Sequence, residues 1–152
     1  MAVLIVFGSM TGNSEGCADD LGKRLAQEGI EHVVESIEDV TPDRLKEAET
    51  LLMCIATWGE GEPPDTAIDL YDEVVVDAKL DLSNLKFSVL ALGDTDYVQF
   101  CECGRAFDEA LEKQGATRIA PRVDCDVDFE EPAAQWIESV VGVLKERAVA
   151  TA

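Results

Sequence analysis

The sequence predicts an α/β domain in which a five-stranded parallel sheet is covered by helices on both faces, the doubly wound arrangement. Short runs rich in β-branched residues alternate with longer amphipathic stretches along the chain. Most of the short runs are apolar at every position, which is typical of strands buried on both faces. With 152 residues, 47% of them hydrophobic, the chain suits one core, so we expect residues 1–152 to form a single domain.

The first strand is expected at residues 3–7, an apolar run that ends at Gly8. A helix should follow over residues 13–27, because its apolar residues are spaced four apart, and Gly29 should terminate it. A second strand is expected at residues 32–36.

The middle of the chain continues this alternation. Thr41 followed by Pro42 is the signal for a capped, short helix. The third strand is expected at residues 51–56, again apolar throughout, and the Pro-Pro-Asp at 63–65 should introduce a helix near residues 66–75.

The second half repeats the pattern. We expect a fourth strand at residues 87–92, a helix from near residue 100 to residue 114 that Gly115 closes, and a fifth strand at about residues 117–123. The last helix should follow Asp128. Its buried side is expected to carry Trp136, Ile137, Val140, Val143 and Leu144.

The chain is strongly acidic. Its 32 Asp and Glu residues against 12 Lys and Arg give a formal net charge of −20. This charge repels phosphate backbones and anionic lipid heads, so we expect no nucleic-acid or membrane partner. Two explanations of the acidity stay open, a solvated or salt-adapted surface and the attraction of basic partners.

The cysteines and the N-terminal segment indicate a compartment. The five cysteines are odd in number and form no C-x-x-C pair. The first apolar run lacks a basic flank and is far shorter than the ~20 residues that span a bilayer. We therefore expect a reduced, cytoplasmic protein with buried thiols. Cys101 and Cys103 lack a second pair of ligands, so no metal site is expected.

Ligands of open parallel sheets bind beyond the carboxyl ends of the strands. Residues 8–14, after the first strand, read Gly-Ser-Met-Thr-Gly-Asn-Ser and lead into a helix. Their backbone N–H groups and the helix dipole would hold an anion, and a phosphate monoester fits best. Neither G-x-x-x-x-G-K-[ST] nor G-x-G-x-x-G is present, which argues against nucleoside triphosphates and dinucleotides. An ordinary polar turn is the alternative.

The segments after the third and fourth strands each carry an aromatic residue, Trp58 and Tyr97. Two rings from different loops can stack on a flat heteroaromatic ligand. Taken separately, Trp58 could be a surface anchor and Tyr97 the start of a helix.

Together these segments resemble the flavodoxins, small electron carriers that bind FMN non-covalently. Residues 8–14 are similar to the phosphate loop of that family, and residues 93–101 are similar to its outer flavin loop. Residues 56–65 look closer to the FMN modules of diflavin reductases such as cytochrome P450 reductase and sulfite reductase. The lack of a long insertion in the fifth strand resembles the short-chain flavodoxins, and the resemblance implies the strand order 2-1-3-4-5.

The resemblance also implies the cofactor contacts. The phosphate would be held by Ser9, Met10, Thr11, Gly12, Asn13 and Ser14. The flavin ring would be contacted by Ala56, Thr57, Trp58, Gly59, Glu60, Gly61, Leu92, Gly93, Asp94, Tyr97, Gln99, Phe100 and Cys101. Trp58 would stack on the inner face of the ring and Tyr97 on the outer face. No catalytic residue is implied.

The function implied is that of a low-potential, monomeric one-electron carrier without substrate turnover of its own. The protein's role is to set the potentials of the FMN, and an acidic chain disfavours the addition of a second electron. Basic reductases and acceptors are the expected partners, through transient electrostatic docking.

Two other functions are alternatives to that of an electron carrier. An FMN-dependent reductase, or the FMN module of a larger NADPH-dependent reductase, is the stronger one, although no second nucleotide fingerprint is visible. A receiver-type signalling domain shares the topology but needs acidic residues after the first and third strands and a lysine after the fifth. Those places hold Phe-Gly, Ala-Thr and Val-Asp pairs instead.

Overall fold

The computed structural model describes residues 3–8, 13–56, 67–77, 79–93, 102–126 and 128–151. Their strands form one parallel sheet in the order β2-β1-β3-β4-β5, with β6 also paired to β4. This confirms the predicted doubly wound fold and its strand order. The strands are β1 (Val3–Gly8), β2 (His32–Ser36), β3 (Thr50–Ala56), β4 (Lys86–Leu92), β5 (Thr117–Arg118) and β6 (Val123–Cys125).

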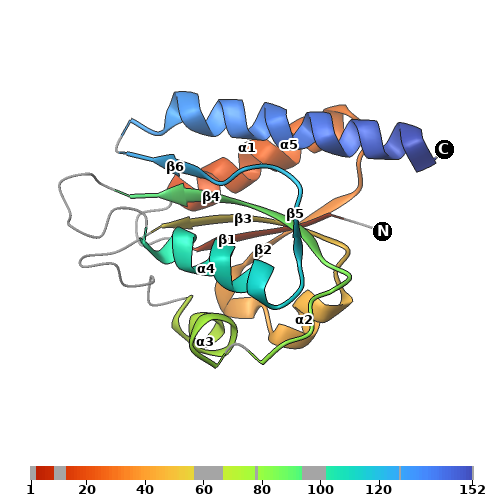
Figure 1. Ribbon diagram of the computed structural model, residues 1–152. Helices are drawn as coiled ribbons and strands as arrows, with labels where there is room; N and C mark the ends of the chain where they lie inside the picture. Colours follow the sequence, from red (N-terminus) through yellow and green to blue (C-terminus); the bar gives the residue numbers. More distant parts are fainter. Residues whose placement is uncertain are drawn as a thin grey trace.

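Helices cover both faces of the sheet. Helices α1 and α5 lie on one face, and α2, α3 and α4 lie on the other (Figure 1). A 3-10 turn, η1, follows β2, and a π-helical segment, η3, continues α3. The bounds are α1 (Asn13–Gln27), η1 (Ile37–Asp39), α2 (Pro42–Glu47), α3 (Ile68–Tyr71), η3 (Asp72–Asp77), α4 (Glu102–Lys113) and α5 (Glu130–Thr151).

Two hydrophobic cores result, one on each face, because successive side chains of a strand point to opposite sides. In β1, Leu4 and Val6 join the core under α2 and α4, whereas Val3 and Ile5 join the core under α1 and α5. All four are almost fully buried. The continuous apolar runs in the sequence follow from this double burial.

The predicted helix boundaries hold at three places. Gly29 follows α1 with φ of 71°, and Gly115 follows α4 with φ of 103°, both in the left-handed region that glycine tolerates. At the start of α2, the Thr41 Oγ1 accepts a hydrogen bond of 3.3 Å from the Arg44 amide. Thr41 is therefore the predicted N-cap.

The fifth strand differs from the prediction of one strand at residues 117–123, because it is divided into β5 and β6. Pro121 lies between them and has no N–H to give to a ladder. Side-chain bonds hold this stretch instead: the Ser88 Oγ donates to the Ala120 carbonyl at 3.1 Å and accepts from the Trp136 Nε1 at 2.9 Å.

The helix predicted near residues 66–75 also differs. Its described part begins as α3 and becomes π-helical at Asp72. The β-branched run at residues 74–76 weakens α-helical geometry. The side chain of Gln114 donates to the Val74 carbonyl at 2.9 Å and accepts from the Leu80 amide at 3.0 Å, which fixes the end of this segment.

The start of the helix predicted near residue 100 lies outside the described residues, and the described part of α4 is Glu102–Lys113. A smaller difference concerns α5. In α5, Val141 is buried and Val143 is only half-buried, because the buried stripe steps from Ile137 to Val141 and Leu144. No helix in the described ranges is both long and apolar enough to cross a bilayer.

Candidate functional site

The carboxyl ends of the strands gather at one edge of the sheet. Gly8 lies beside Ile55, Ala56 beside Leu92, and Leu92 beside Cys125 in the strand register. Helix α1 begins at this edge, since it follows β1 (Figure 1). The edge is therefore where the topology brings together segments that are far apart in the sequence.

Five of the predicted site residues belong to the described part of this edge: Asn13 and Ser14 in the first turn of α1, Ala56 at the end of β3, and Leu92 and Gly93 at the end of β4. The other predicted residues lie outside the described residues and stay predictions. They are Ser9, Met10, Thr11, Gly12, Thr57, Trp58, Gly59, Glu60, Gly61, Asp94, Tyr97, Gln99, Phe100 and Cys101.

Ser14 carries the clearest sign of a ligand at this edge. Its side chain is fully buried, and its Oγ has no hydrogen-bond partner among the described residues. A buried hydroxyl without a partner costs about 1–3 kcal/mol. It lies in the first turn of a 15-residue helix, where unpaired N–H groups and the helix dipole favour an anion. A phosphate group fits this combination of a buried donor and a helix N-terminus.

The backbone at the edge is tightly packed. A Cβ added to Gly8 would lie 2.7 Å from the Ile55 Cδ1 and 2.9 Å from the Ile37 Cγ2, so only glycine fits there without a shift of these side chains. The Gly93 amide donates to the Cys125 carbonyl at 2.8 Å, which ties the end of β4 to β6.

Three buried thiols lie beneath this edge in one core: Cys17 on α1, Cys54 on β3 and Cys125 on β6. Burial raises the pKa of Cys17 to about 11, and the nearby carboxylates of Asp20 and Glu130 add to the rise. Burial also raises the pKa of Cys125 to about 11 and that of Cys54 above its usual range. The three thiols therefore stay protonated at neutral pH and offer no thiolate nucleophile.

Sequence reasoning missed an ion-pair network that joins α4 to the stretch between β5 and β6. Asp108 on α4 is buried, yet it lies between two guanidinium groups. It accepts from the Arg118 Nε at 2.9 Å and from the Arg122 Nη1 at 3.1 Å. An aspartate on the buried side of a helix was the available signal, because buried carboxylates are almost always paired.

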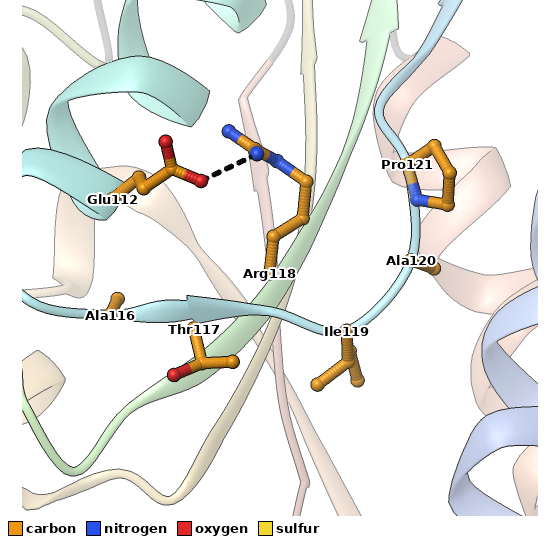
Figure 2. Close-up of a pocket in the computed structure, with 7 residues that line it drawn as sticks. All are labelled: Glu112, Ala116, Thr117, Arg118, Ile119, Ala120 and Pro121. Carbon is orange, nitrogen blue, oxygen red and sulfur yellow. Dashed lines mark hydrogen bonds and ion pairs between the residues drawn. The ribbon is translucent and has the colours of Figure 1, made fainter.

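A groove outlined by Glu112 and residues 116–121 runs along the outer side of β5 (Figure 2). Figure 2 shows the Arg118 guanidinium turned toward Glu112, and the Nη1–Oε2 distance is 2.6 Å. None of the predicted site residues lines this groove. The edge at the strand ends, with the unpartnered Ser14 hydroxyl, therefore remains the candidate functional site.

Known proteins similar to this chain are of two kinds. A family model described as flavodoxin matches residues 5–136. Among curated proteins, the sulfite reductase [NADPH] flavoprotein alpha-component of Bacillus subtilis (strain 168) is 46% identical over 144 residues, which cover 95% of this chain and 24% of that protein. The protein of the same name from Shewanella sp. (strain MR-7) is 41% identical over 143 residues, 94% of this chain and 24% of that protein. The chain thus spans about a quarter of the length of these relatives.

Solved structures match over nearly their whole length. A flavodoxin of Streptococcus pneumonia TIGR4 superposes with a TM-score of 0.85 at 31% identity, covering 97% of this chain and 99% of that chain. The oxidised flavodoxin 2 from Bacillus cereus superposes with a TM-score of 0.82 at 28% identity, covering 93% of this chain and 99% of that chain.

Proposed function

Since the chain belongs to the flavodoxin family, whose cofactor is FMN, we propose that it is a low-potential one-electron carrier between redox partner proteins. The observation that supports this most directly is the buried, unpartnered hydroxyl of Ser14 at the N-terminus of α1. Its place at the strand ends matches the phosphate position that the family resemblance implies.

The residues at this edge fit FMN. Ser14 and the first amides of α1 would bind the phosphate, and the ends of β3 and β4 at Ala56, Leu92 and Gly93 would lie along the ring. Bound FMN supplies the ability to take up and release electrons singly. The chain's own contribution is to bind, to orient and to set the local electrostatic potential.

The charge near the edge supports a low potential for the second electron. Cys17 lies one helical turn from Ser14 in α1, and besides burial, the carboxylates of Asp20 and Glu130 disfavour a negative charge on its thiol. The same charges disfavour added negative charge on a ligand bound at this edge. A carboxylate ~10 Å away is worth about 0.4–1.7 kcal/mol, which corresponds to roughly 20–70 mV for one electron.

A second candidate is the FMN module of a larger NADPH-dependent reductase. The observation that favours it is the 46% identity to the sulfite reductase flavoprotein component, against 31% for the flavodoxin structure. In that role the chain would take electrons from a nicotinamide-oxidising module and pass them to a separate acceptor. Both candidates use the same site and differ in the source of the electrons.

The proposal also covers the domain organisation, compartment, oligomeric state and partners of the protein. We propose a single folded domain in the cytoplasm, monomeric, whose transient partners present basic surfaces. The formal charge of −20 supports basic partners, because opposite charges steer encounters between proteins.

Purified protein tests the proposal. We expect it to be yellow or to take up added FMN, and a dithionite titration should resolve two successive one-electron steps with a low second potential. A colourless protein that fails to take up FMN would contradict cofactor binding, and a single two-electron step would contradict the carrier. NADPH alone should not reduce the flavin, whereas NADPH with a nicotinamide-oxidising reductase in trans should. Direct reduction by NADPH would instead indicate an enzyme.

A further inference from the structure

We propose that Arg122 is a positioning residue for the ring side of the flavin site, because it joins α4 to β6. This inference rests on the proposed function and adds a residue to it that the family resemblance did not supply. Arg122 lies between β5 and β6, just before Val123.

The guanidinium of Arg122 spans two elements. Its Nη1 donates to the Asp108 Oδ2 on α4 at 3.1 Å. Its Nε and Nη2 donate to the two carboxylate oxygens of Asp124 on β6 at 2.8 and 3.3 Å. The Arg122 side chain is about one-fifth exposed, and the bond to Asp108 is partly buried, whereas the two bonds to Asp124 are exposed to water.

Asp108 makes a firm anchor for this bridge. Its side chain is only 5% exposed. It also accepts two bonds from Arg118, from Nε at 2.9 Å and from Nη2 at 3.0 Å. Loss of Arg122 would therefore leave the buried carboxylate paired, so that a variant at Arg122 removes the bridge without creating an unpaired buried charge.

The bridge leads directly to predicted flavin contacts. Asp124 precedes Cys125, whose carbonyl accepts from the Gly93 amide at 2.8 Å, and Cys125 lies beside Leu92 in the register. Gly93 and Leu92 are both predicted to contact the ring. The described part of α4, which carries Asp108, begins at Glu102. Arg122 thus fixes the strand end at Gly93 relative to the helix that follows it in the chain.

Geometry distinguishes this role from that of a simple positive charge. The planar guanidinium holds Asp124 with two parallel bonds while a third bond reaches Asp108. A lysine ammonium carries the same charge but cannot form this fork. Arg122→Lys should therefore behave like Arg122→Gln if bridging matters, and like the wild type if only charge matters.

The test compares Arg122→Gln and Arg122→Lys with Arg44→Gln. Arg44 is the matched control. Its partly exposed ion pair with Glu35, at 3.6 Å, joins α2 to the edge strand β2 and involves neither α4 nor β6. Two quantities are measured on apoprotein shown to be folded by circular dichroism. One is the hydrogen-exchange rate of the Gly93 amide by NMR, and the other is the dissociation constant for riboflavin and for FMN.

We expect both Arg122 variants to speed exchange at Gly93 and to weaken riboflavin and FMN binding by the same factor of about ten, the effect of losing one charge-assisted bridge. Arg44→Gln should change each quantity less than twofold.

An unchanged hydrogen-exchange rate at Gly93 would contradict the proposal that Arg122 holds the strand end in place. Faster exchange with unchanged flavin affinity would contradict a role of Arg122 in the flavin site. An Arg122→Lys variant equal to the wild type would also overturn the proposal. A wild type that binds neither flavin would contradict the proposed function instead, and the exchange rates would still decide whether the bridge exists.

Discussion

A single side chain, Ser14, connects the fold to the proposed chemistry. Proteins rarely leave a buried hydroxyl without a partner, because the lost hydration is not recovered. In Ser14 the hydroxyl is fully buried and unpartnered within the described residues, in the first turn of a long helix. A bound phosphate would supply the missing acceptor.

Ser14→Ala should therefore weaken FMN binding by about tenfold, the value of roughly one hydrogen bond to a charged group, and leave riboflavin binding unchanged. Apoprotein stability should stay equal or rise slightly, since an unsatisfied polar group is removed. Flavin titrations with both ligands and urea unfolding measure these effects.

Ser88→Ala is the control. The buried Ser88 hydroxyl is bonded to the Ala120 carbonyl and the Trp136 Nε1, so its loss should destabilise the apoprotein by about 1–3 kcal/mol. Equal losses of FMN and riboflavin affinity in Ser14→Ala would contradict the phosphate assignment.

Because of Cys17, the free energy of unfolding should fall as the pH rises into the alkaline range. Its pKa is about 11 in the folded protein against 9.0 for an ordinary thiol. Between these values the unfolded chain releases the proton while the folded chain keeps it, so stability falls as pH rises above 9. The slope for one such thiol approaches about 1.4 kcal/mol per pH unit. Urea unfolding of the apoprotein at pH 7, 9 and 10 should show a shallower decline in Cys17→Ala than in the wild type, and equal declines would refute the assignment.

Helix α4 packs closely against β4 at Gly104. A Cβ added there would lie 2.3 Å from the Ala91 Cβ and 3.1 Å from the Ala91 Cα. The helix must therefore move away from β4 if this residue carries a side chain. Because α4 also carries Asp108, such a movement would disturb the ion pairs with Arg118 and Arg122.

Gly104→Ala should destabilise the apoprotein by about 1–3 kcal/mol, as overpacking in a well-packed core does. Gly142→Ala is the matched control, since a Cβ added at Gly142 in α5 meets nothing within 4 Å. The control should gain up to about 1 kcal/mol from the better helix propensity of alanine. Thermal or urea unfolding measures both, and a neutral Gly104→Ala would show that α4 shifts without cost.

Most elements could be predicted from periodicity, because double burial makes β1, β3 and β4 apolar at nearly every position. The break between β5 and β6 could not, since it depends on Pro121 and on the bonds that join Ser88, Ala120 and Trp136 across long sequence separations. The π-helical segment is likewise held by a distant side chain, because the Gln114 Nε2 donates to the Val74 carbonyl.

The site was predictable to the extent that topology determines it. Parallel strands bring Ser14, Ala56, Leu92 and Gly93 to one edge, as expected from the strand order. The contacts assigned to residues 57–61 and 94–101 came from family resemblance and stay predictions. Arg122 was missed because its partner Asp108 is 14 residues away, a separation with no periodic signal.

At the scale of the whole molecule, we expect the net charge of −20 to govern encounters with basic partners. Electron transfer from the reduced protein to a basic c-type cytochrome should slow as ionic strength rises from about 0.01 to 0.15 M, because the screening length falls from ~30 to ~8 Å. Stopped-flow rates measure this, with a neutral small-molecule acceptor as the control. A rate independent of salt would assign the charge to solubility alone.

The parallel order has one more consequence for handling this molecule. Because β1 starts at the edge opposite the strand ends, and α5 runs back in that direction, the start of β1 and the end of α5 both lie on the side away from the strand ends (Figure 1). A purification tag, a fluorescent label or an electrode linker attached at either position would therefore leave the strand-end edge facing solution. Attachment to a surface through either end of the chain would therefore orient the strand-end edge away from that surface.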